Sequence, residues 1–159
     1  MEMLENMSEQ KPKREYIFKG ESSLEHYEAA SYDVACVDDR FWKVRKNFVK
    51  SLGEKHIDPK TPAGGAMVFS SPIEESDREH HLRELGISIR LHHVKKIRLF
   101  THHDCGAYGG FGKFNNDPDV ELEFHKSEHL KATEVIHERY PDLIVETYFI
   151  DDVGIVKTS

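Results

Sequence analysis

Two cysteines and one histidine are the residues of this chain whose types and spacing could bind a metal ion. Cys36 and Cys105 are its only cysteines, each follows a short apolar run, and His102 precedes Cys105 by three residues. Such runs are typical of buried strands, and open α/β sheets bind ligands at the carboxyl ends of their strands. Two thiolates and one imidazole are a common zinc set, which leaves a fourth position for water. Cys36, His102 and Cys105 therefore predict a catalytic zinc site.

An acidic and a basic residue closely follow the first cysteine. Asp38 and Arg40 lie two and four residues after Cys36. An arginine fork can hold a carboxylate ionised through paired hydrogen bonds, and Asp38 could then accept a proton from water at the metal. Such an acceptor is useful because two thiolates offset the charge of Zn²⁺ and acidify its water less. Asp38 could instead take the fourth coordination position, or form only a surface ion pair with Arg40.

The same residues allow other interpretations. Free cysteine is a common small core residue, and two cysteines can form a disulfide, although a reducing compartment favours metal binding or catalysis. A metal-free cysteine hydrolase would use Cys36 or Cys105 as nucleophile, His102 as base and Asp104 as the orienting group. His103, next to a predicted ligand, could carry protons between the site and solvent.

Composition narrows the class of protein. The chain has 159 residues, enough for one domain, with 38% hydrophobic and 32% charged residues, and its net charge of −7 argues against a general nucleic-acid binder. No apolar run approaches the roughly 18 residues of a membrane-spanning helix. Residues 1–14 are polar and lack the apolar core of a signal peptide. We therefore expect a cytoplasmic protein with a small-molecule substrate and no nucleic-acid or membrane partner.

Hydrophobic patterns place the candidate ligands on alternating strands and helices. Short apolar runs predict strands at 33–37, 67–69, 97–102 and 143–150. Apolar spacing and start and stop residues predict helices at 41–52, 71–94 and 117–139. The alternation indicates an α/β fold, with a mainly parallel central sheet and flanking helices. We expect a single zinc-binding domain at 15–159, preceded at 1–14 by a segment that is disordered or docks on a partner subunit.

The two motifs together resemble a known family. Cys36-Val37-Asp38-Asp39-Arg40 and His102-His103-Asp104-Cys105-Gly106 resemble the paired C-x-D-x-R and H-x-x-C-G signatures of the β-class carbonic anhydrases. The likeness extends loosely over residues 33–151 and is greatest to the short members of that family. The resemblance implies zinc bound by both cysteines and the histidine, with the Asp-Arg pair as the catalytic dyad beside the metal. It also implies reversible hydration of carbon dioxide to bicarbonate, an antiparallel edge strand, and a homodimer or larger even oligomer.

The chain departs from the family pattern near the expected substrate pocket. Thr61-Pro62 stands before the small Ala63-Gly64-Gly65 loop, where the family usually has an Arg-Asn-like pair with polar side chains. The glutamine that a partner subunit usually contributes is not identifiable either. Two alternatives therefore stand beside the carbonic anhydrase: a hydrolase of a related heterocumulene such as carbonyl sulfide, and a non-enzymatic zinc-binding homologue.

Overall fold

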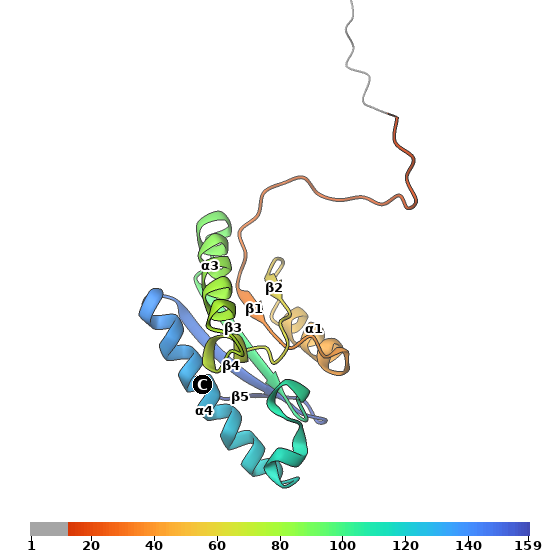
Figure 1. Ribbon diagram of the computed structural model, residues 1–159. Coiled ribbons are helices and arrows are strands. Elements are labelled where there is room, and N and C mark those ends of the chain that lie inside the picture. The colour runs from red at the N-terminus through yellow and green to blue at the C-terminus, as the bar shows by residue number, and fades with distance from the viewer. Residues whose placement is uncertain (1–12) are drawn as a thin grey trace, which may run out of the picture.

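A five-stranded sheet forms the centre of the computed structural model, which describes residues 13–159 (Figure 1). The strands are β1 (Tyr32–Val34), β2 (Asp58–Lys60), β3 (Lys96–His102), β4 (Ile144–Ile150) and β5 (Ile155–Lys157). They lie in the order β2-β1-β3-β4-β5, and all neighbours are parallel except the β4–β5 pair at one edge. The predicted α/β fold with a mainly parallel sheet and one antiparallel edge strand is confirmed.

Helices cover both faces of this sheet (Figure 1). They are α1 (Trp42–Ser51), α2 (Met67–Ser70), α3 (Glu75–His92) and α4 (Pro118–Arg139), with short 3-10 segments at Asp39–Phe41, Gly106–Tyr108 and Phe111–Phe114. On one face, buried side chains of β1 and β3 pack against α2, α3 and α4. On the other face, α1 packs against Phe100, Tyr148 and Ile150. Burial on both faces explains why the central strands read as apolar runs.

Capping residues determine where α3 and α4 begin. The Asp117 side chain accepts hydrogen bonds from the backbone of Asp119 and Val120, and Pro118 begins α4, as the sequence predicted. Helix α3 begins later than the predicted residue 71, because Glu74 and Asp77 form a reciprocal capping box there. These caps set where each helix begins.

The predicted strand at 67–69 is wrong. Residues Met67–Ser70 form the short helix α2, which is buried except at its first residue, so its apolar run has no helical periodicity. The second strand is instead β2, which contains Pro59 and pairs only with β1. Proline is tolerated there because β2 lies at the edge of the sheet. The first strand also ends at Val34, so Cys36 lies in the loop that follows it.

The N-terminal segment leaves the body of the molecule. The structure describes it only from residue 13, so the prediction for residues 1–14 lies almost wholly outside the described residues. The described part before Tyr27 extends away from the sheet without regular structure (Figure 1). The chain joins the domain before β1 begins, because Tyr27 bonds to Asp58 and Ala29 is buried in the core. Its large apolar side chains are exposed, namely Tyr16, Ile17, Phe18 and Leu24. Among residues 13–159, no helix is long and apolar enough to cross a membrane.

Candidate metal centre

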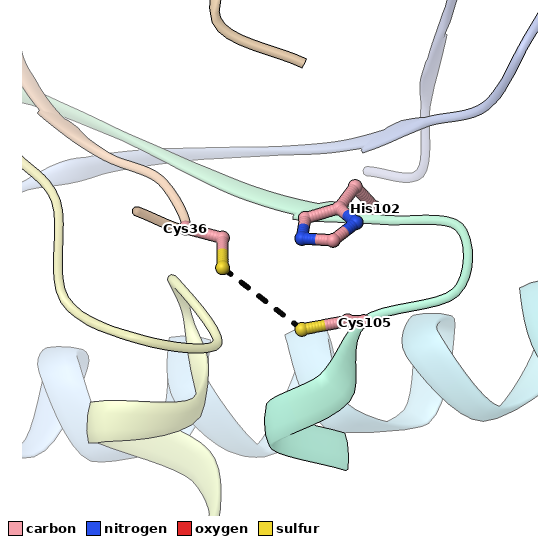
Figure 2. A group of neighbouring side chains, drawn as sticks. All are labelled: Cys36, His102 and Cys105. Carbon is pink, nitrogen blue, oxygen red and sulfur yellow. Dashed lines mark hydrogen bonds between the residues drawn. The ribbon is translucent and has the colours of Figure 1, made fainter. Parts of the chain in front are cut away.

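The three predicted metal ligands meet at the carboxyl ends of two adjacent strands. β1 pairs directly with β3, so the loop after β1 brings Cys36 beside His102, the last residue of β3, and Cys105 in the next turn. One ligand atom from each of the three residues lies within 4.8 Å of the others. Their side chains converge on a common point (Figure 2), with the two sulfur atoms 4.0 Å apart. This convergence is what a three-ligand metal site requires.

His102 is oriented as a metal ligand. Its Nδ1 donates to the backbone carbonyl of His103 at 2.7 Å, which leaves the lone pair of Nε2 free. Within the described part of the chain, Nε2 is buried and has no hydrogen-bond partner. The ring of Phe41 stacks on the imidazole, with 4.3 Å between ring centres, and restrains its orientation. An orphaned nitrogen facing two sulfur atoms fits a bound cation.

The two cysteines complete a donor set that suits zinc. The Cys105 thiol, whose sulfur lies 4.0 Å away, and the Gly64 amide, which donates at 3.3 Å, stabilise the thiolate of Cys36 and lower its pKa. The hydrogen bond of the Cys105 thiol to Cys36, together with burial, raises the pKa of Cys105. Metal binding deprotonates both thiols, since the thiolate is the ligand. Two thiolates with one imidazole match zinc better than magnesium or calcium, which prefer oxygen ligands.

A glycine lets a neighbouring loop approach the first cysteine. Gly65 has φ of +58°, and a Cβ there would overlap the carbonyl oxygen of Phe100 and lie 3.0 Å from the Cys36 amide. Only glycine combines this left-handed backbone with so close an approach. Gly65 thus closes the loop that brings the Gly64 amide to the Cys36 sulfur.

The Asp38 and Arg40 side chains lie beside this cluster. Arg40 donates to the carboxylate of Asp38 through Nε at 3.0 and 3.1 Å and through Nη2 at 2.7 Å. These bonds lower the pKa of Asp38 to about 2 and keep it ionised. Oδ2 of Asp38 lies 3.8 Å from Nε2 of His102. The Asp38 carboxylate therefore lies at the edge of the cluster formed by Cys36, His102 and Cys105.

Asp104 holds the other side of the arginine. Its Oδ2 accepts from Nη1 of Arg40 at 3.2 Å, its carbonyl oxygen accepts from Nη2 at 3.1 Å, and its Oδ1 accepts from the Phe111 amide at 2.9 Å. Asp104 does not bond to His102, whose Nδ1 is bonded to backbone. The cysteine hydrolase interpretation needs a group that orients His102, and the structure shows that Asp104 does not serve as that group. Sequence reasoning missed the contact with Arg40, although the position of Asp104 next to a ligand was a signal.

Sequence reasoning also missed Glu121. This residue lies in the first turn of α4, is 1% exposed, and bonds to His103 and to the Asp104 amide. His103 itself is partly exposed and packs edge-on against the ring of Phe111. A glutamate in the first turn of a helix is ordinary in sequence. Only the tertiary fold places Glu121 beside the turn between His102 and Cys105.

The fold and the site together define a class of α/β protein in which two cysteines and a histidine that could bind a metal lie at the carboxyl edge of the sheet. The protein-family model described as putative carbonic anhydrase matches residues 28–158. The chain belongs to this family. Two curated relatives, uncharacterized proteins of Rickettsia conorii and Rickettsia bellii, are 27% and 28% identical to it over 157 and 151 residues. Each alignment covers 89% of this chain, and 80% and 90% of the relatives.

Solved structures support the same fold. The chain resembles β-carbonic anhydrase isoform I of Trichomonas vaginalis with a TM-score of 0.58 and 16% identity, covering 88% of this chain and 87% of that one. A tetrameric β-carbonic anhydrase of Sordaria macrospora gives 0.56 and 15%, with coverage of 82% and 81%. The apo form of a carbon disulfide hydrolase gives 0.53 and 16%, with coverage of 84% and 80%. At such identities, the likeness establishes a β-carbonic-anhydrase-like fold.

Proposed function

We propose that this protein is a zinc-dependent, carbonate dehydratase-like lyase that catalyses the reversible hydration of carbon dioxide to bicarbonate. The convergence of Cys36, His102 and Cys105, with the His102 Nε2 buried and free of hydrogen bonds among the described residues, is the observation that carries the proposal. Family membership agrees with it.

Each residue has a distinct role in this proposal. Cys36, His102 and Cys105 hold the zinc ion, which supplies the Lewis acidity that makes a water molecule a better nucleophile near neutral pH. Asp38 would be the acceptor for the proton of that water, because its carboxylate is ionised and lies at the edge of the cluster. Arg40 holds that carboxylate in place with its fork of N–H groups. His103 is exposed enough to pass protons on to solvent.

A second candidate function is hydrolysis of a related heterocumulene such as carbonyl sulfide. The structural likeness to a carbon disulfide hydrolase favours it, since the same fold supports that chemistry in another protein. Carbon dioxide, carbonyl sulfide and carbon disulfide are all small and linear, so the shape of the pocket selects among them. A non-enzymatic zinc-binding homologue is the remaining alternative, and Thr61-Pro62 in place of a polar pair favours it.

We further propose that the protein is cytoplasmic and forms a homodimer or a larger even oligomer. The support is the apolar side chains of Tyr16, Ile17, Phe18 and Leu24, which are 59–105% exposed on a segment that leaves the domain. Exposed apolar side chains gathered on one segment are typical of an interaction surface. The relatives of known structure include proteins described as tetrameric.

Metal analysis combined with an assay of carbon dioxide hydration tests the proposed function. Purified protein should contain about one zinc ion per chain and accelerate hydration, whereas Cys36→Ser and Cys105→Ser should lose both metal and activity. His80→Gln, at an exposed histidine on α3, is the control and should keep both. Full zinc occupancy in either cysteine variant would exclude that residue as a ligand. Zinc without hydration activity, but with turnover of carbonyl sulfide, would move the conclusion to the second candidate.

A further inference from the structure

One buried glutamate binds both residues that separate His102 from Cys105. Glu121 Oε2 accepts from Nδ1 of His103 at 2.6 Å, and Oε1 accepts from the backbone amide of Asp104 at 2.8 Å. We propose that Glu121 is a positioning residue, which holds this turn in the conformation that directs both ligands at one ion. The inference rests on the proposed metal centre and names a residue that controls it.

The turn needs such a restraint because its backbone is unusual. Asp104 has φ of +53°, in the left-handed region that residues other than glycine rarely adopt. A neighbouring bond fixes the start of the turn, since the His103 amide donates to the carbonyl of Ile150 at 2.8 Å. The bond from the Asp104 amide to Glu121 then fixes the next peptide. Cys105 follows directly, so the direction of its side chain depends on that peptide.

The position of Glu121 in the fold suits this role. Its side chain is 1% exposed, and it projects from the first turn of α4, where the helix dipole favours a negative charge. Both carboxylate oxygens have donors, so the cost of burying the charge is offset. Helix α4 has 22 residues and packs on the sheet through Ala132 and Ile136, which makes it a rigid support. Glu121 thus attaches the turn at residues 102–105 to the rigid helix α4.

The bond between the Asp104 amide and Glu121 also affects the Asp38–Arg40 pair. Asp104 holds Arg40 through its carboxylate and its carbonyl oxygen. A shift of the Asp104 backbone would therefore move the arginine as well as Cys105. Loss of Glu121 should affect metal affinity and dyad geometry together.

The test measures zinc affinity in four proteins, by competition with a chromogenic chelator, and the absorption spectrum of the Co²⁺-substituted forms. Glu121→Leu should bind zinc about 10- to 100-fold more weakly and give a weaker tetrahedral cobalt spectrum, as expected when an outer partner of metal ligands is lost. Glu121→Gln should stay within about threefold of wild type, since its amide can still accept from Asp104 and donate to His103. Glu128→Gln is the matched control: Glu128 lies on the same helix, is 2% exposed, and bonds instead to Ser70 and Lys131.

Several outcomes would overturn the inference. Wild-type affinity in Glu121→Leu would show that the turn holds its shape unaided. An equal loss in Glu121→Gln would assign the effect to charge, and an equal loss in Glu128→Gln would assign it to general destabilisation. If Glu121→Leu does not fold, His103→Ala offers a second test, because it removes one of the two bonds to Glu121 by changing a partly exposed side chain. This variant should bind zinc several-fold more weakly than wild type. Unchanged zinc affinity would count against the proposal. A wild-type protein that binds no zinc would instead contradict the proposed function.

Discussion

The guanidinium of Arg40 engages both oxygens of the Asp38 carboxylate, with its shortest bond, from Nη2 to Oδ2, at 2.7 Å. The same guanidinium reaches the Asp104 carboxylate, so Arg40 lies between two acids. A residue held from both sides cannot easily turn toward solvent, even though its side chain is 55% exposed. The geometry of the Asp38 carboxylate is therefore set before any substrate binds.

Replacing Asp38 should separate catalysis from metal binding. Asp38→Asn keeps the shape but removes the ionised acceptor, so hydration should fall on the order of 10²-fold or more while zinc stays bound. Arg40→Lys should lower the rate as well, because an ammonium cannot reproduce the forked contact. Asp39→Asn, at the exposed residue between them, is the control and should resemble wild type.

The pH profile distinguishes the two roles left open for Asp38. Rates measured from about pH 6.5 to 9 bracket the ordinary pKa of histidine and the pKa near 7 that zinc can give water. If Asp38 occupies the fourth coordination position at rest, wild type should be nearly inactive at neutral pH and gain activity as the pH rises. Equal rates in wild type, Asp38→Asn and Arg40→Lys, with zinc bound, would contradict the dyad mechanism.

Two buried histidines on α4 should make the fold sensitive to acid. Burial lowers the pKa of His125 to about 3 and of His129 to about 4, below the unfolded value near 6.5. Because the folded pKa values are depressed, the stability they contribute is complete above pH 6.5 and is lost as the pH falls toward them. Between pH 6.5 and 5, the wild type should lose about 1.5 kcal/mol more stability than His125→Leu.

Urea unfolding of the metal-free proteins at the two pH values measures this difference. Metal-free protein is needed because acid also displaces metal from thiolates. The groups around His125 that could alter the result are His129, Glu128, His102 and Lys113, all present in both proteins. Parallel stability curves for wild type and His125→Leu would show that the pKa of His125 is the same in the folded and unfolded states, which would contradict the prediction.

The loop beside the first cysteine should tolerate no side chain at Gly65. Gly65→Ala would force a methyl group against the carbonyl of Phe100 and hold a left-handed backbone, at a cost of about 2 kcal/mol or more. Gly112→Ala is the control, since φ there is not positive and nothing lies within 4 Å of the added carbon. Thermal unfolding of both variants checks this, and equal midpoints would show that the loop can move aside.

The N-terminal segment should be needed for assembly. Light scattering at micromolar concentration should give a homodimer or a larger even oligomer. Deletion of residues 1–24 should reduce the number of subunits in the oligomer, because it removes the exposed apolar side chains. An active wild-type monomer of 18.4 kDa would contradict the proposal. An unchanged oligomer after the deletion would place the interface elsewhere on the chain.

Sequence patterns predicted the elements whose signals are local. Asp117-Pro118 marked the start of α4, and the apolar runs before Cys36 and up to His102 located β1 and β3. Once two parallel strands were placed, general rules of open sheets predicted that the residues after them would meet. The ligand cluster could be proposed for this reason.

The errors and omissions have equally physical causes. The run at 67–69 is buried almost completely as a helix, and a short buried helix has the same apolar pattern as a buried strand. β2 has the sequence Asp-Pro-Lys, which carries no strand signal and is paired only through its backbone. Glu121 contacts residues 17 and 18 positions earlier in the chain, and no local pattern reports such a contact.

The separation along the chain of the two proposed sulfur ligands determines the order in which the site can form. Cys36 and Cys105 are 69 residues apart and meet only after β1 has paired with β3. In the unfolded chain, His102 and Cys105 are already close together, but bringing Cys36 to them closes a long loop, which costs entropy. Metal uptake should therefore follow the formation of the sheet, and the rate of zinc capture during refolding would report when the central strands assemble.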